Sequence, residues 1–335
     1  MSELIQIATS QPVFPGDNPI RSLVMADSQA SGGQTAVGTR SAVNRRIPEW
    51  LTIRMPRRKD TDDVERLMRS QGLHTVCEEA RCPNLGECWA KRAATFMIMG
   101  DTCTRSCRFC AVKTGRGGPL DPDEPRKVAE SAAALGLLHT VVTSVNRDEL
   151  PDGGAEHFAQ TIAWMRKLVP GTIVEVLTPD FLGNKKSIQI VVDAKPDIFN
   201  HNIETVPRLY RQVRPQARYG RSLEFLRFVK EADPSIYTKS GFMVGFGEGR
   251  DEVIALLEDL KAHNVDAVTI GQYLKPGKNY LDVVEYVHPD IFAEYKEIGE
   301  SMGFLFVASG PFIRSSYNAK ELSDRFLAMR SEKRH

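Results

Sequence analysis

The six cysteines are the residues of this chain best suited to chemistry, and all of them lie between positions 77 and 110. They form an N-terminal triplet with gaps of four and five residues and a loop triplet with gaps of three and two. The N-terminal triplet is Cys77, Cys82 and Cys88, and the loop triplet is Cys103, Cys107 and Cys110. Inert structural thiols would be scattered through a core, so the clustering predicts that this segment binds something.

Three kinds of thiol site compete at this point. Disulfides are disfavoured because the first thirty residues lack the features of a secretory signal. Zinc normally takes four ligands in paired C-x2-C units, which neither triplet offers, although six thiolates sharing two zinc ions is arithmetically allowed. Iron–sulfur clusters also use closely spaced thiolates, usually four per [4Fe–4S] cluster. Each triplet is one ligand short, and an iron without a protein ligand can bind a small molecule or a weaker donor.

The overall composition is that of a globular protein, with 335 residues, 41% hydrophobic and 26% charged. Forty-four basic and forty-three acidic side chains leave a net charge of +1, too balanced for a broad field that binds nucleic acid or anionic membranes. No run of eighteen apolar residues suggests a membrane span. We therefore expect no nucleic-acid or membrane partner and a cytoplasmic location, since the acidic residues near the start argue against a transit peptide.

Strand-like and helix-like segments alternate after residue 92, which predicts parallel strands with right-handed crossovers. The expected strands are residues 95–99, 139–144, 172–177, 197–201, 237–244 and 267–272. The expected helices between and after them are residues 125–135, 155–168, 185–193, 223–231, 250–263 and 291–302. Six pairs suit either an incomplete barrel or a doubly wound sheet, and composition does not choose between them.

The two ends of the chain differ from this pattern. Residues 1–44 are rich in Ser, Gly, Gln, Thr and Ala without a sustained period, which predicts a flexible tail, and Met25 is an alternative start. A basic arm over residues 45–59 surrounds Trp50 and is interpreted as solvated, with a docking surface as the alternative.

The loop triplet, with Phe109 before its last cysteine and a predicted strand before the loop, resembles the cluster loop of radical S-adenosylmethionine (SAM) enzymes. The segments 77–84 (CEEARCPN), 87–89 (ECW) and 314–317 (RSSY) make the chain similar to the lipoyl synthase family in particular. The resemblance runs from about Ile47 to about Tyr317.

This resemblance implies an α/β fold, a partial (β/α)6 TIM-like barrel. A cysteine-bearing extension over residues 45–92 would precede the barrel at residues 93–308, and a helical extension over residues 309–335 would follow it. In the family, a [4Fe–4S] cluster on the loop triplet binds SAM and cleaves it to a 5′-deoxyadenosyl radical. Such a radical is needed because acid–base chemistry cannot activate an aliphatic C–H bond.

The implied reaction inserts sulfur at C6 and C8 of an octanoyl chain on a lysine of a lipoyl carrier domain. A second [4Fe–4S] cluster on the N-terminal triplet would be consumed as sulfur donor. Its fourth ligand would be Ser316, with Ser315 as the alternative. Without the resemblance, either serine would be interpreted as capping or turning the chain.

Other positions gain a role only from the resemblance. Residues 143–148 stand where the superfamily holds the methionine amine, residues 202 and 204 match positions near the ribose and methionine, and an arginine at 221 could pair with the cofactor carboxylate or lie on the surface. The predicted cofactor-binding residues are Ser144, Asn146, Asn202, Glu204 and Arg221. His201 is typical of a satisfied core histidine, the glycines of residues 241–248 would let backbone approach the adenine, and Lys239, Gln272 and Tyr273 have no assigned role.

The resemblance also implies partners. These are octanoylated lipoyl carriers such as the glycine cleavage H protein and the acyltransferase subunits of 2-oxo acid dehydrogenases, a flavodoxin- or ferredoxin-type electron donor, and an iron–sulfur cluster carrier. The alternatives are another sulfur-inserting or methylthio-transferring member of the superfamily, a zinc-binding module and a plain electron carrier.

Overall fold

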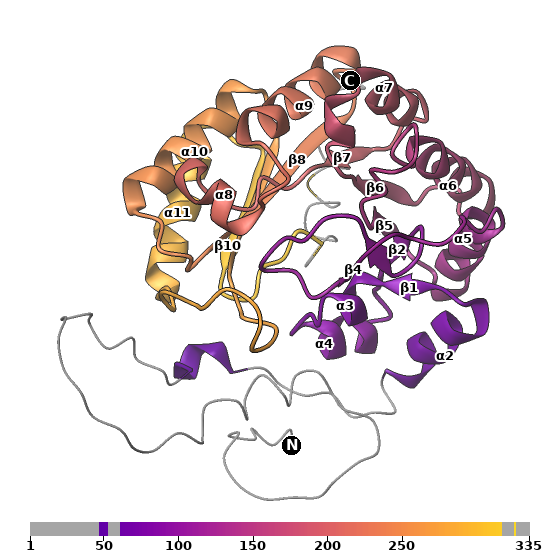
Figure 1. The fold of residues 1–335 in the computed structure, drawn as a ribbon, viewed down its shortest axis with the longest axis horizontal. Helices are drawn as coiled ribbons and strands as arrows, with labels where there is room; N and C mark the ends of the chain where they lie inside the picture. Colours follow the sequence, from indigo (N-terminus) through magenta and orange to yellow (C-terminus); the bar gives the residue numbers. More distant parts are fainter. Residues whose placement is uncertain (1–46, 53–60, 317–324, 326–335) are drawn as a thin grey trace, which may run out of the picture.

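The computed structural model describes residues 47–52, 61–316 and 325, which form an open barrel of strands with helices outside it (Figure 1). The main sheet has eight strands in the order β1-β2-β5-β6-β7-β8-β9-β10. Every neighbouring pair from β2 to β10 is parallel, whereas β1 runs antiparallel to β2. The sheet therefore ends at β1 and β10 without closing.

The six predicted strands are all present, and β10 adds a seventh parallel strand after the last predicted helix. Their bounds are β2 Thr95–Ile98, β5 His139–Ser144, β6 Ile173–Leu177, β7 Ile198–Asn200, β8 Tyr237–Val244, β9 Ala267–Gln272 and β10 Phe306–Gly310. Most of these strand residues are buried, because helices cover the outer face of the sheet and side chains fill the interior. The predicted partial (β/α)6 barrel is confirmed.

Six long helices follow the first six of these strands. They are α5 Glu124–Leu135, α6 Ala155–Leu168, α7 Lys185–Asp193, α9 Tyr219–Ala232, α10 Arg250–Ala262 and α11 Pro289–Ser301. Helix α5 shows why they form. Pro125 stands in its first turn, its buried face includes Val128, Ala129, Ala132 and Leu135, and Gly136 ends it in the left-handed conformation at φ 66°. Shorter helical turns, η3 Phe181–Gly183, η4 Pro207–Leu209 and α8 Tyr210–Val213, lie in the loops after β6 and β7.

The N-terminal extension covers the first edge of the barrel with residues 62–90, whereas its residues 49–51 lie apart from that edge, beside His288 at the start of α11 (Figure 1). It consists of η1 Glu49–Leu51, α2 Asp62–Gln71, β1 His74–Thr75, α3 Val76–Glu79 and α4 Leu85–Ala90. The sequence predicted the extension but not the pairing of β1 with β2, because two residues are too few to show a strand period.

The predicted flexible tail, most of the basic arm and most of the C-terminal helical extension, residues 317–324 and 326–335, lie outside the described residues. Within the arm, the Trp50 ring packs edge-on against His288 with 4.8 Å between ring centroids, and Leu51 is buried. In the described part of the chain, no helix is both long and apolar enough to span a membrane.

A charged cluster lies inside the barrel and crosses consecutive strands. Lys239 Nζ on β8 donates to both carboxylate oxygens of Glu175 on β6, at 2.9 and 3.2 Å. His139 on β5 contacts the same carboxylate at 3.1 Å, and Asn200 on β7 donates to it at 2.9 Å. All four side chains are almost fully removed from solvent, so Lys239, left open by the sequence, has a structural partner here.

Candidate active site

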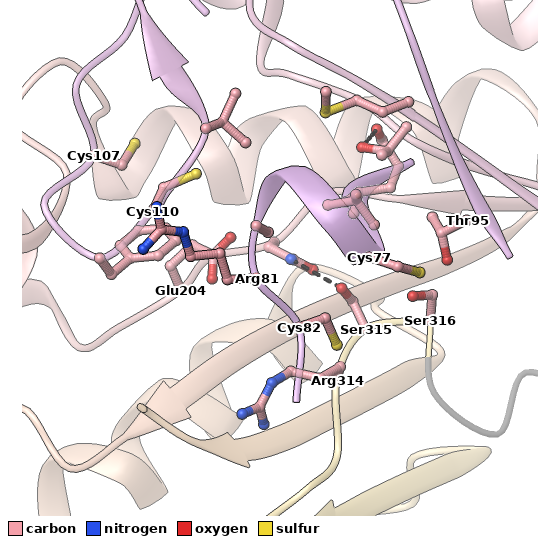
Figure 2. Close-up of a pocket in the computed structure, with 18 of the residues that line it drawn as sticks. Cys77, Arg81, Cys82, Thr95, Cys107, Cys110, Glu204, Arg314, Ser315 and Ser316 are labelled. Carbon is pink, nitrogen blue, oxygen red and sulfur yellow. Dashed lines mark hydrogen bonds between the residues drawn. The ribbon is translucent and has the colours of Figure 1, made fainter. Parts of the chain in front are cut away.

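All six cysteines line a single cavity of about 420 Å³ at the carboxyl ends of the strands. Figure 2 shows Cys107 and Cys110 on one side of this cavity and Cys77 and Cys82 on the other. Four of the five predicted cofactor-binding residues and both candidate serines also line it, namely Ser144, Asn146, Asn202, Glu204, Ser315 and Ser316. The fold therefore brings the two cysteine triplets together with Ser315 and Ser316, which lie far from both triplets in the sequence.

The loop triplet sits on a closed loop that follows β2. Two short parallel strands, β3 Thr102–Cys103 and β4 Lys113–Thr114, close the loop at its base. Cys103 Sγ accepts hydrogen bonds from the backbone N–H of Arg105 at 3.4 Å and of Asn146 at 3.3 Å. The Asn146 side chain adds a third contact to this sulfur at 3.5 Å. Cys103 is therefore fixed against the segment that follows β5.

A buried ionic network holds the same loop to the barrel. Arg105 donates to both oxygens of Asp148 at 2.7 and 2.8 Å and to Asp180 at 2.6 Å. Arg221 Nε donates to the other oxygen of Asp180 at 2.7 Å. Burial alone would raise the pKa of Asp180, but the hydrogen bond and charge of Arg105 hold it well below its usual range.

This network changes the interpretation of Arg221. The sequence placed Arg221 on the cofactor carboxylate, but in the structure its guanidinium pairs with Asp180 and it is not among the residues that line the cavity. Sequence reasoning missed Arg105 and Asp180. An acidic residue just after a parallel strand was the available signal for Asp180, which follows β6 by three residues.

The N-terminal triplet is carried by α3, α4 and the turn between them. Cys77 lies in α3, Cys88 lies in α4, and the Cys82 N–H donates to the Cys77 carbonyl at 3.0 Å. Asn84 Nδ2 donates to the Phe312 carbonyl at 2.7 Å, which joins this extension to the C-terminal segment. That bond spans 228 residues of sequence and explains how the serines of residues 314–317 reach the triplet.

The two candidate serines lie differently. Ser315 Oγ accepts a hydrogen bond from Asn202 Nδ2 at 3.3 Å, whereas Figure 2 shows the Ser316 side chain extending toward Cys77. Arg314 lies beside Cys82 in the same view. Burial raises the pKa of Cys82, and the positive charge of Arg314 opposes this shift.

Burial disfavours the thiolate form of five of the six cysteines. Burial raises the pKa of Cys77, Cys88 and Cys110 to about 12, from an ordinary value of 9.0. None of the six cysteines is in a disulfide. In the described residues no three His, Cys, Asp or Glu side chains gather closely enough for one metal ion.

Several buried polar atoms of the cavity have no hydrogen-bond partner within the described residues. They belong to lining residues and are Ser144 Oγ, Asn146 Oδ1, Thr178 Oγ1, Asn202 Oδ1, Arg105 Nη1 and Arg214 Nε. Native proteins rarely leave such atoms unsatisfied, so their concentration in one place indicates a polar ligand. Both donors and acceptors are present, which fits a zwitterionic molecule such as SAM.

Glu204 has the features of a functional carboxylate. Its φ angle is 69°, in the left-handed region that non-glycine residues seldom adopt. Burial raises its pKa, and Arg214 opposes this shift. Arg214, which the sequence did not single out, is itself buried, and its Nη1 donates to the Asn202 carbonyl at 2.7 Å. Arg214 and Glu204 thus lie together beside the loop triplet. Burial raises the pKa of Cys107, the positive charge of Arg214 opposes this shift, and the negative charge of Glu204 adds to it.

Two neighbouring residues are explained by packing. His201 contacts the Thr178 carbonyl at 2.9 Å and Ser222 Oγ at 3.0 Å, and burial lowers its pKa to about 4, so it is a satisfied core histidine as predicted. At Gly241 a Cβ atom would come within 2.5 Å of Thr269 Oγ1 and 2.9 Å of Asn202 Oδ1. The absence of a side chain at Gly241 therefore leaves space for Asn202, which forms part of the cavity wall.

Comparison with known proteins agrees with this site. The Radical SAM superfamily matches residues 97–288, and the N-terminal domain of lipoyl synthase of the radical SAM family matches residues 23–82. Lipoyl synthase of Rubrobacter xylanophilus is 58% identical over 277 residues, which cover 83% of this chain and 86% of that protein. Lipoyl synthase of Caldanaerobacter subterraneus subsp. tengcongensis is 58% identical over 274 residues, covering 82% of this chain and 96% of that protein. The chain therefore belongs to the lipoyl synthase family of the radical SAM superfamily.

Proposed function

We propose that this enzyme inserts two sulfur atoms, at C6 and C8, into an octanoyl group bound to a lysine of a lipoyl carrier domain. The observation that carries this proposal is the single cavity lined by both cysteine triplets. A substrate carbon held there lies between two sulfur-rich walls. A plain electron carrier or a zinc module would not need both triplets to face one cavity.

The loop triplet would hold a [4Fe–4S] cluster with one iron open to SAM. Bound there, the cluster and SAM supply the one-electron chemistry that removes hydrogen from an unactivated C–H bond. We assign Ser144, Asn146, Asn202 and Glu204 to SAM, because they line the cavity and three of them carry buried side-chain atoms without a partner. The positive charge of Arg214 acts on the Glu204 carboxylate. Arg221 would contribute only indirectly, because it binds Asp180.

The N-terminal triplet and Ser316 would hold a second [4Fe–4S] cluster, the sulfur donor. Ser316 is preferred over Ser315, because Ser315 Oγ is occupied by Asn202 and Ser316 extends toward Cys77 (Figure 2). An alkoxide is a harder ligand than a thiolate and a poorer match for iron in a sulfide cluster. We infer that Ser316 would be the weakest protein ligand of such a cluster.

The rest of the cavity suits an acyl chain. Apolar side chains line it from the extension, the strands and the C-terminal segment, including Val76, Met97, Val141, Met243, Leu274 and Phe312. They would exclude water and hold the chain extended between the triplets. The carrier partners proposed are the H protein and the acyltransferase subunits. We further propose a flavodoxin- or ferredoxin-type donor, a cluster carrier for rebuilding, and a cytoplasmic location, where six thiols stay reduced.

The proposal is tested by purifying the protein without oxygen and counting its metals. Two clusters predict a brown protein with about eight irons. The protein is then reduced and mixed with SAM and an octanoylated lipoyl domain. Formation of 5′-deoxyadenosine together with a mass gain of two sulfurs on the carrier supports the function. Stoichiometric zinc without iron would favour a binding module, and 5′-deoxyadenosine without sulfur on the carrier would favour another member of the superfamily.

A further inference from the structure

The three thiols of the loop triplet receive hydrogen bonds unequally. Cys103 Sγ is contacted by three N–H groups, the backbone amides of Arg105 and Asn146 and the side-chain amide of Asn146, at 3.3 to 3.5 Å. Cys110 has a backbone contact with Val112. Two of the three donors on Cys103 belong to one residue that lies 43 positions away in the sequence.

These donors are held in place by the surrounding backbone. Thr104 donates to the Asn146 carbonyl with both its N–H and its hydroxyl, each at 3.0 Å. The Asp148 N–H donates to Thr104 Oγ1 at 3.2 Å, and Arg105 binds the Asp148 carboxylate with two hydrogen bonds. The segment after β5 and the start of the cysteine loop thus form one unit, so the Asn146 N–H groups are aimed at the sulfur before any ligand binds.

The nitrogen and the oxygen of the Asn146 side-chain amide have different surroundings. Its Nδ2 faces Cys103, and its buried Oδ1 has no partner among the described residues and lines the cavity. The oxygen is therefore available to a ligand bound in the cavity, while the nitrogen contacts Cys103 Sγ.

We propose that the side-chain amide of Asn146 raises the reduction potential of the cluster bound by the loop triplet, through its N–H contact with Cys103 Sγ. This inference rests on the proposed function, because it needs Cys103 to be a cluster ligand. Reduction adds negative charge that spreads onto the ligand sulfurs, and N–H dipoles pointing at a sulfur stabilise that charge. Asn146 is thus a tuning residue for electron acceptance in addition to lining the SAM site.

The test compares Asn146→Leu with Thr178→Val in the full chain, reconstituted without oxygen. Thr178 is the matched control, because it also lines the cavity with a buried side-chain oxygen that has no partner among the described residues, and its isosteric replacement removes no donor to Cys103. Midpoint potentials are measured without SAM by redox titration monitored by electron paramagnetic resonance. The signal of the cluster on the loop triplet is identified separately, as the one that changes when SAM is added. We expect a more negative midpoint potential in Asn146→Leu and an unchanged one in Thr178→Val.

Asn146→Asp provides a second variant of the same shape, in which a carboxylate replaces the N–H donor. We expect its potential to fall further than that of Asn146→Leu. Equal potentials in Asn146→Leu, Asn146→Asp and the unmodified protein would overturn the inference. Loss of iron from both Asn146 variants would also overturn it, since Asn146 would then hold the thiol and not tune it. An unmodified protein that binds no cluster on the loop triplet would instead contradict the proposed function.

Discussion

Arg105 and Asp180 join the cysteine loop to the barrel by a hydrogen bond of 2.6 Å between two side chains that are 2% and 0% exposed. Arg105 stands between the first two cysteines of the loop triplet, and Asp180 follows the third strand of the parallel sheet. The position of two thiols therefore depends on an ion pair with the scaffold.

We expect Arg105→Met to destabilise the protein by about 3 kcal/mol, because it removes the cation that pairs with Asp148 and leaves the fully buried Asp180 with Arg221 alone. Urea unfolding measures this loss, and iron counting should show less iron at the loop triplet. Arg208→Met is the matched control. Arg208 also binds a carboxylate, Glu252, with two hydrogen bonds of 2.8 Å, but its side chain is 56% exposed. Its loss should cost about 1 kcal/mol or less. Equal effects of the two substitutions would contradict a positioning role for Arg105.

The charged cluster inside the barrel predicts a pH dependence of stability. Burial alone would raise the pKa of Glu175, but Lys239 and His139 lower it to about 2 from an ordinary value of 4.5. A carboxyl group whose folded-state pKa is lowered stabilises the fold fully above pH 4.5, and this contribution is lost as the pH falls toward 2. Its size is on the order of 3 kcal/mol.

Glu175→Gln should therefore lower the free energy of unfolding near neutral pH and flatten its decline below pH 4.5. Denaturant titrations of the metal-free protein across this range provide the measurement. Glu130→Gln is the control, because Glu130 pairs with Arg126 at the surface and the exposures are 40% and 38%. A Glu175→Gln protein that keeps the unmodified pH profile would show that the cluster does not set it.

The proposed serine ligand of the second cluster is tested by replacement with a softer donor. Ser316→Cys should give a cluster that survives longer against chelators but transfers sulfur poorly, because thiolate holds iron more firmly than alkoxide. Iron retention and single-turnover product are measured together. Ser315→Cys is the control and should change neither in this way, since Ser315 is bound to Asn202. Full activity of Ser316→Cys would remove Ser316 from this role.

The sequence predicted the barrel well because alternating apolar runs and helical periods report on burial, which is a local property of each segment. All six strands lie where expected, and β2, β6 and β7 differ from the prediction only by shorter ends. The antiparallel β1 was not foreseen, since its partner is chosen by tertiary contact.

The site was predictable where the type and spacing of the residues alone indicate the chemistry. It was less predictable where the role of a residue depends on which side chain it contacts in the fold. The cysteine spacing identified both triplets, whereas Arg221 had no signal that distinguished Asp180 from a ligand carboxylate as its partner. Asp180 lies in the loop after β6 and Arg221 lies in α9, and their meeting depends on how the barrel curves. Such long-range pairs are fixed by the fold, and no short motif contains them.

The most direct test of the central claim follows the sulfur itself. The protein is reconstituted with sulfide enriched in a heavy sulfur isotope, freed of unbound sulfide, and allowed one turnover with SAM, reductant and an octanoylated lipoyl domain. The account predicts heavy sulfur at both inserted positions and loss of the cluster held by Cys77, Cys82 and Cys88. A lipoylated carrier containing only natural-abundance sulfur, with both clusters intact, would contradict it.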